Sequence, residues 1–134
     1  MADQSPNEQL VRKFFETLST GDLDALRPLL HPEATWTPMG KNIPGAGVHV
    51  GHKGILDEFL APVRGMFQPG DPKVHINNVV ERGDTVAVES KSLGTFTNGT
   101  PYDNDYAWFF QIKDGQVFRL REYMDTAYVQ SVTS

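Results

Sequence analysis

The chain contains no cysteine, no cluster of lysine and arginine, and no apolar run near the roughly 18 residues of a membrane span. The lack of cysteine excludes thiol catalysis, disulfide bonds and cysteine-ligated metal centres. A formal net charge of −5 without a basic cluster argues against binding to nucleic acids or anionic membranes. We therefore expect a protein that has no nucleic-acid partner and no membrane partner.

The length of 134 residues suits one compact domain, residues 1–134. A chain of this size buries about two-thirds of the surface that its unfolded form exposes, enough for a core and a modest internal cavity. The first residues show neither the charged segment nor the apolar segment of a secretory signal, so we expect a soluble, cytoplasmic protein.

Helix signals dominate the first quarter of the chain. Ser5 followed by Pro6 is typical of a helix N-terminus, and apolar residues then recur at helical spacing as far as Leu18. Asp22 can cap a second helix, which Pro32 is expected to stop.

The next segments combine a long loop with one more helix. After a short apolar segment at residues 34–37, the glycine- and proline-rich stretch 38–51 predicts a loop, and loops of this length often serve as lids or binding loops. A third helix is predicted over residues 53–66, where Pro62 must bend or end its regular part.

The apolar periodicity changes to two in the second half of the chain, which indicates β-strands. Asn98-Gly99 and Asp114-Gly115 are hairpin signals between neighbouring strands. The predicted strands cover residues 74–79, 85–96, 102–113 and 116–123. Helices followed by an antiparallel meander predict an α+β domain whose helices cover one face of a curved sheet.

Two segments carry a resemblance to a known family: residues 14–24, FFETLSTGDLD, and residues 114–125, DGQVFRLREYMD. With this order of elements, the chain resembles the SnoaL-like branch of the NTF2-like superfamily. The resemblance implies a cone-shaped sheet around a pocket that helices close, usually in a homodimer packed through the sheets. Known relatives include ketosteroid isomerases, limonene epoxide hydrolases, polyketide cyclases and non-catalytic binding proteins, so the fold alone does not define a reaction.

The catalytic set of the ketosteroid isomerases is missing. Those enzymes use a tyrosine on the first helix, a base after the first strand and an acid on the third strand of the sheet. The matching positions here are Phe14, the Thr37-Pro38 pair and Trp108. None of these side chains can move a proton as the family's residues do.

The set of the limonene epoxide hydrolases is largely missing as well. Ser90 and Ser92 stand where an arginine and an aspartate belong, and Thr37 and Met39 where the residues that hold water belong. Only Asp125 matches an acidic position. The resemblance to polyketide cyclases also makes Asp125 the candidate general acid or base.

Strand alternation indicates which polar groups share a face with Asp125. If Asp125 points into the cone, the period of two places Arg121 and Tyr123 on the same side. The resemblance puts a second set on the inner face: Ser90, Ser92, Asn104, Tyr106 and Trp108. A mostly aromatic and neutral set suits a flat, hydrophobic ligand held by a few hydrogen bonds.

Burial of Asp125 would raise the pKa of its carboxyl group, and a nearby Arg121 would oppose that shift. Each of these residues also has a purely structural explanation. Asp125 can instead cap the terminal segment 126–129 by accepting a backbone N–H. Tyr106 and Trp108 can serve packing alone, and Ser90 lacks a partnered histidine or lysine that would make it a nucleophile.

The histidines do not form a metal-binding motif. Zinc sites usually show tighter spacing on a regular element, and the histidines here are scattered over loops and one strand: His31, His49, His52 and His75. We therefore predict no metal site. The resemblance instead suggests that Trp36 and His49 border the mouth of the cavity.

These residues and the resemblance lead to two functional hypotheses from different classes. The first is a SnoaL-like enzyme that acts without a cofactor on a hydrophobic cyclic or carbonyl-bearing metabolite, as an acid/base isomerase, cyclase or hydrolase using Asp125. The alternative is a non-catalytic ligand-binding or assembly module. An Asp125 exposed to an enclosed cavity favours the enzyme, whereas an Asp125 turned onto backbone N–H groups favours the module. The resemblance also predicts a homodimer, with Ala107, Phe109 and Gln111 on its interface.

Overall fold

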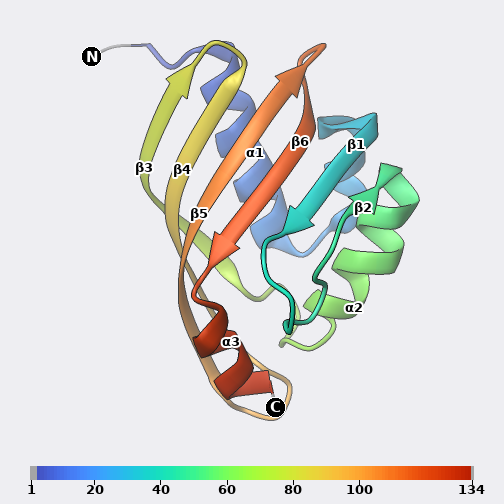
Figure 1. Cartoon of the computed structure of the whole chain (residues 1–134), viewed down its shortest axis with the longest axis vertical. Coiled ribbons are helices and arrows are strands. Elements are labelled where there is room, and N and C mark those ends of the chain that lie inside the picture. Colours follow the sequence, from blue (N-terminus) through green and yellow to red (C-terminus); the bar gives the residue numbers. More distant parts are fainter. Residues whose placement is uncertain (1–2, 134) are drawn as a thin grey trace.

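The computed structural model describes residues 3–133, and a single sheet of six strands forms its centre (Figure 1). Its elements are, in chain order, α1 (Pro6–Thr20), the 3₁₀ helix η1 (Leu23–Leu29), β1 (Leu30–Pro38), β2 (His49–Val50), the π-helix η2 (Lys53–Leu60), α2 (Ala61–Arg64), β3 (Lys73–Arg82), β4 (Thr85–Thr95), β5 (Pro101–Lys113), β6 (Gln116–Met124) and α3 (Thr126–Thr133). The strand order is β2-β1-β6-β5-β4-β3. Among the strands of residues 3–133, only β1 and β6 pair in parallel, so the predicted α+β fold with a mainly antiparallel sheet is confirmed.

Helix α1 forms where the sequence predicts a helix, and its ends explain why. The Ser5 hydroxyl accepts the backbone N–H of Glu8 at 3.0 Å, which satisfies one of the free donors of the first turn. At the other end Gly21 adopts φ of 82° and donates its N–H to the Leu18 carbonyl. The apolar stripe of the helix, including Phe14 and Phe15, is buried against the sheet.

The segments after α1 differ from the prediction in three places. The second helix ends at Leu29, and Pro32 lies inside β1 because Leu30 already pairs with Val117 of β6. The predicted loop 38–51 contains the short strand β2, whose His49 pairs with Trp36. The predicted third helix is split into η2 and α2, with Pro62 in the first turn of α2.

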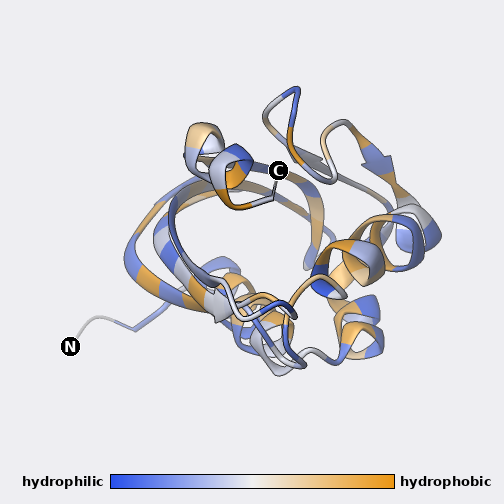
Figure 2. Cartoon of the chain, turned by 90° about the horizontal axis from the view of Figure 1, so that it is seen from below, coloured by the Kyte–Doolittle hydropathy of each residue, from blue (hydrophilic) through white to orange (hydrophobic). Residues whose placement is uncertain are grey.

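The sheet is curved, and its concave face carries the core. Seen from below, it bends around the helices, and hydrophobic and hydrophilic residues alternate along its strands (Figure 2). One cluster of buried residues joins α1, η1 and η2 to the middle of the sheet, with Phe14, Phe15 and Phe110 in mutual ring contact. A smaller cluster lies toward α3 and consists of Ile43, Phe67, Phe96, Tyr102 and Val129. The site described below adjoins this second cluster.

None of the helices in the described part of the chain is both long enough and apolar enough to cross a membrane.

Candidate functional site

A pocket opens between the concave face of the sheet and the segments η2, α2 and α3. It has a volume of about 90 Å³, several times the space that one water molecule requires. Most of its wall is apolar, including Trp36, Leu60, Phe67, Phe96, Trp108 and Val129. Among the described residues, Arg64 and Glu122 are the charged side chains that line it.

Glu122 is a buried carboxylate in this wall. It lies on β6 opposite Trp108 of β5, and only 7% of its surface is exposed. The indole Nε1 of Trp36 donates a hydrogen bond of 2.7 Å to Glu122 Oε1. Burial raises the pKa of Glu122 to about 7, and the bond from Trp36 opposes this shift in part. Near neutral pH this carboxyl group can therefore both accept and give up a proton.

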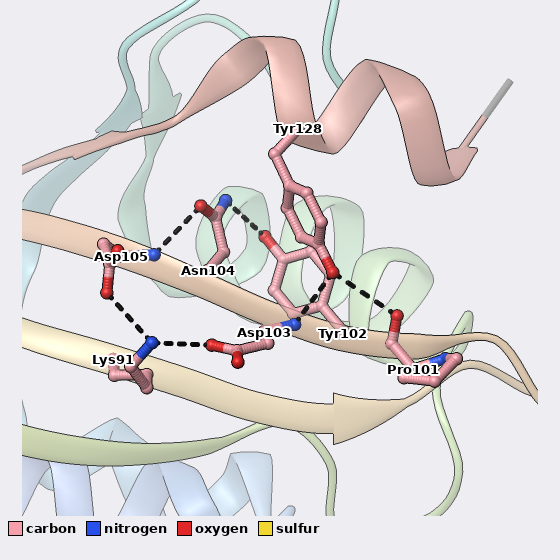
Figure 3. A network of polar contacts seen from close by, with 7 residues as sticks. All are labelled: Lys91, Pro101, Tyr102, Asp103, Asn104, Asp105 and Tyr128. Carbon is pink, nitrogen blue, oxygen red and sulfur yellow. Dashed lines mark hydrogen bonds and ion pairs between the residues drawn. The ribbon is translucent and has the colours of Figure 1, made fainter.

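A chain of hydrogen bonds reaches the pocket from β5. The hydroxyl groups of Tyr102 and Tyr106 lie 2.6 Å apart, and both residues line the pocket. Asn104 Nδ2 donates to the Tyr102 oxygen at 3.0 Å, as the close view of this strand shows (Figure 3). Burial raises the pKa of both tyrosines, well above the usual value in the case of Tyr106. Both phenols are therefore protonated at neutral pH and can act as hydrogen-bond donors.

The indole of Trp108 is held in a fixed orientation on the same strand. Its Nε1 donates to the Ser90 hydroxyl at 2.8 Å, and its ring stacks on Tyr106 with centroids 5.2 Å apart. Ser90 and Asn104 are buried behind the wall, whereas Ser92 lines the pocket itself. The inward orientation predicted for these β4 and β5 residues agrees with the structure. Of the set, Ser92, Tyr106 and Trp108 reach the pocket.

Asp125, the predicted acid/base, lies outside the pocket wall. Its side chain is exposed, and Oδ1 accepts the backbone N–H of Tyr128 at 3.1 Å in the first turn of α3. The Tyr128 hydroxyl in turn accepts the Asp103 N–H at 3.1 Å and donates to the Pro101 carbonyl at 3.5 Å (Figure 3). Asp125 therefore caps the helix, and Tyr128 fastens this helix to the start of β5.

The prediction that Arg121 and Tyr123 face the pocket is wrong. Both are exposed on the outer face of the sheet, where Arg121 lies over Phe109 and Tyr123 contacts the same ring edge to face. The prediction assigned the inner face from Asp125, which lies just beyond the last residue of β6. Along the regular strand it is Leu120 and Glu122 that point inward.

His49 lies beside the pocket and fixes the neighbouring loop. Its ring stacks on Phe59 with centroids 4.3 Å apart, and Nε2 lies 2.6 Å from the Gly45 carbonyl oxygen. Gly45 has φ of +78°, and a Cβ atom there would come within 2.4 Å of the Phe59 ring. This packing holds the loop so that Ile43 and Pro44 line the pocket, whereas His49 itself does not.

Within residues 3–133, no group of three or more histidine, aspartate or glutamate side chains is placed to hold a metal ion. Phe109 is 38% exposed on the outer face, between the partly buried Ala107 and the exposed Gln111. The homodimer through this face stays a prediction.

Sequence reasoning missed Glu122, Arg64 and the hydroxyl of Tyr102. A signal for Glu122 was present, because Leu120 is apolar between the charged Arg119 and Arg121 and so marks the inner face of β6. Glu122 follows Leu120 by two residues and must share that face. Arg64 gave no comparable signal, since it ends a helix beside a loop whose course the sequence does not predict.

In a comparison with known families, residues 11–120 match the family model described as SnoaL-like domain. The search of curated proteins found no match.

Many solved structures share the fold. TerC, crystallised with polyporic acid, is 26% identical with a TM-score of 0.83 over 95% of this chain and 97% of its own. Bal32a, from a soil-derived mobile gene cassette, is 25% identical with a TM-score of 0.80 over 93% of each chain. A provisionally assigned SnoaL-like polyketide cyclase from Jannaschia sp. CCS1 is 23% identical, with a TM-score of 0.79 over 98% of this chain and 96% of its own.

Proposed function

The chain belongs to the SnoaL-like family, and on this premise we propose that it is an enzyme that moves a proton on a hydrophobic, carbonyl-bearing small molecule. Glu122 is the acid/base group, and Tyr106 is the hydrogen-bond donor to the carbonyl oxygen. The reaction needs no cofactor in this proposal. It belongs to the isomerase or cyclase type, in which one carbon next to a carbonyl loses a proton and another atom gains one.

The observation that carries the proposal is the state of Glu122. Its carboxyl group lines the pocket, has one hydrogen-bond partner among the described residues, and titrates with a pKa of about 7. A group with a pKa near the working pH is the most effective proton carrier. Buried carboxyl groups with such shifts gather at catalytic sites more often than elsewhere.

The proposed step uses the carboxyl group on β6 together with the tyrosine hydroxyls on β5. The Glu122 carboxylate removes a proton from the carbon beside the carbonyl, and the electron pair moves onto the carbonyl oxygen to form an enolate. Tyr102 accepts from Asn104 and can donate to Tyr106, which leaves the Tyr106 proton free for that oxygen. The protonated Glu122 then returns the proton at a new position. A fixed donor aimed at developing negative charge is a strong source of catalysis.

The relatives support binding of a small molecule in this fold. TerC has been crystallised with polyporic acid. The wall of aromatic side chains here, including Trp36, Trp108 and Tyr106, suits a flat apolar ligand.

The proposal is tested with a cyclic ketone whose own protons report the chemistry. The exchange of the α-protons of 2-tetralone for deuterium is followed by NMR in D₂O, with the wild type, Glu122→Gln and Asp125→Asn. We expect wild-type protein to accelerate the exchange, Glu122→Gln to lose about 100-fold of this acceleration, and Asp125→Asn to keep it, since general bases contribute factors of this order. Equal acceleration by Glu122→Gln contradicts the proposed role.

The non-catalytic ligand-binding module remains the second candidate, because one observation favours it. Asp125 is turned onto a backbone N–H of α3, which is the arrangement expected for a module that has lost its family chemistry. Saturable binding of 2-tetralone by wild-type protein without faster exchange identifies the protein as such a module.

A further inference from the structure

We infer that Arg64 is an anion-binding site within the pocket, and that the natural ligand is a planar apolar molecule carrying a carboxylate or a similarly compact anionic group. This inference rests on the proposed binding of a small molecule and names its chemical class. It concerns the part of the pocket formed by the helical layer, whereas Glu122 belongs to the sheet.

Arg64 is held in place by the loop that follows its helix. It is the last residue of α2, and its Nη2 atom donates to the carbonyl oxygens of Gly70 at 3.3 Å and Pro72 at 3.1 Å. These two bonds use one nitrogen of the guanidinium group. Within residues 3–133, Nε and Nη1 make no hydrogen bond, and the side chain lines the pocket.

The charge of Arg64 has no ion-pair partner within 4.0 Å in the described part of the chain. Asp71 is the acidic group near it, but Asp71 Oδ2 accepts the backbone N–H of Thr95 at 3.0 Å. Burial lowers the pKa of Arg64, and Asp71 offsets this only in part. An arginine stays protonated under such conditions, so the pocket wall contains a partly buried positive charge that has no ion-pair partner among residues 3–133.

The free donors define the chemistry of the partner. A guanidinium group presents its N–H bonds in a planar fork that matches the two oxygens of a carboxylate. Because the remaining wall is mainly aromatic and aliphatic, the rest of the ligand is apolar. Arg64 and Glu122 form no ion pair with one another, so an anion at Arg64 need not displace a contact to the acid/base group.

The test compares two probes of the same shape, 2-naphthoate and its neutral analogue 2-naphthamide, by isothermal titration calorimetry. At about pH 6 Glu122, with its pKa of about 7, is mostly protonated, and naphthoate is ionised. We expect wild-type protein to bind naphthoate about tenfold or more tightly than naphthamide, the size of a charge-assisted hydrogen bond. Arg64→Met should bring the ratio of the two affinities to about one, since only the anion loses a partner.

The ratio separates anion binding from structural damage. Loss of the hydrogen bonds from Arg64 to the loop carbonyls should weaken the binding of both probes equally. Loss of the anion site should weaken the binding of naphthoate alone. Arg64→Gln keeps an amide that can donate to the loop carbonyls. If Arg64→Met fails to fold, the ratio of the two affinities is therefore measured on Arg64→Gln. Arg27→Met removes the same charge from the exposed surface of η1, where Arg27 pairs with Asp24, and should leave the ratio unchanged.

A wild-type ratio of about one, or a wild-type ratio retained in Arg64→Gln, overturns the inference. The outcome is independent of the acid/base proposal, because 2-tetralone carries no anionic group. Accelerated proton exchange of 2-tetralone can therefore be observed even if the protein does not prefer naphthoate. A preference for naphthoate can likewise be observed without accelerated exchange.

Discussion

The two ends of the concave face differ in what fills them. Toward α1, the space is filled by interlocking rings: Phe14 meets Phe110 with centroids 5.4 Å apart, and Phe15 meets Trp108 at 4.9 Å. Toward α3, the wall contains a carboxyl group, two phenols and a guanidinium group around open space. The same strands, β5 and β6, run through both ends.

The contrast separates the end of the sheet that contributes most to stability from the end that holds the groups of the proposed chemistry. A close-packed end gains most from apolar burial and tolerates no polar group without a partner. An open end can hold polar groups whose pKa values are shifted, because the packed end supplies the stability that they cost. Substitutions at equivalent positions in the two ends test this distinction.

The largest expected effect is at the packed end. Phe14→Ala removes a fully buried ring from α1, and we expect a loss of about 3–5 kcal/mol in the free energy of unfolding, measured by chemical denaturation. Phe67→Ala removes the same atoms at the open end, where the new space joins an existing pocket, so its cost should be smaller. Equal losses for the two variants contradict the distinction between the ends.

The next effect concerns pH. Because the pKa of Glu122 rises from 4.5 to about 7 on folding, the folded state keeps a proton that the unfolded state has released. Wild-type stability should therefore fall as the pH rises through this range, by about 3 kcal/mol in total, and level off above it. Glu122→Gln should lack this fall and be the more stable protein at about pH 8.

The control for this titration is Glu89→Gln, which changes an exposed glutamate of β4. Its unfolding free energy should follow that of the wild type across the pH range. If Glu122→Gln also runs parallel to the wild type, burial does not perturb this carboxyl group and the main support for the proposed chemistry is lost.

The smallest effect is expected at Asp125. Asp125→Ala removes the side-chain acceptor for the Tyr128 N–H and should cost about 1 kcal/mol of stability, typical of a lost helix cap. Because α3 contributes Val129 to the pocket, a modest loss of ligand affinity should accompany the unfolding measurement. Asp125→Asn retains an oxygen acceptor and should behave like the wild type.

Much of the fold could be predicted because local signals agree with tertiary packing. The caps at Ser5 and Gly21 lie at the ends of α1, and the turns at Asn98-Gly99 and Asp114-Gly115 lie between successive strands of the sheet. The start of β1 could not be predicted, since it depends on pairing with β6, more than eighty residues further along the chain (Leu30 with Val117). Pairing over such distances overrides the local effect of Pro32.

The candidate site was predictable in part for the same reason. Alternation along β5 places Tyr106 and Trp108 on one face, because an antiparallel strand in the middle of a sheet keeps its period of two, and the family resemblance implied that this is the inner face. Extending alternation back from Asp125 failed, since that residue begins the cap of a helix and has left the strand. Arg64 depends on a loop course that no local pattern encodes.

The chain has two tryptophans, and both line the pocket. All of its indole fluorescence therefore originates at the site, so emission reports on ligand entry without any attached dye. Trp36 also touches the Glu122 carboxyl group directly. A change in charge at that carboxyl alters the electric field beside one of the two fluorophores, which makes the protein an optical indicator of its own proposed acid/base group.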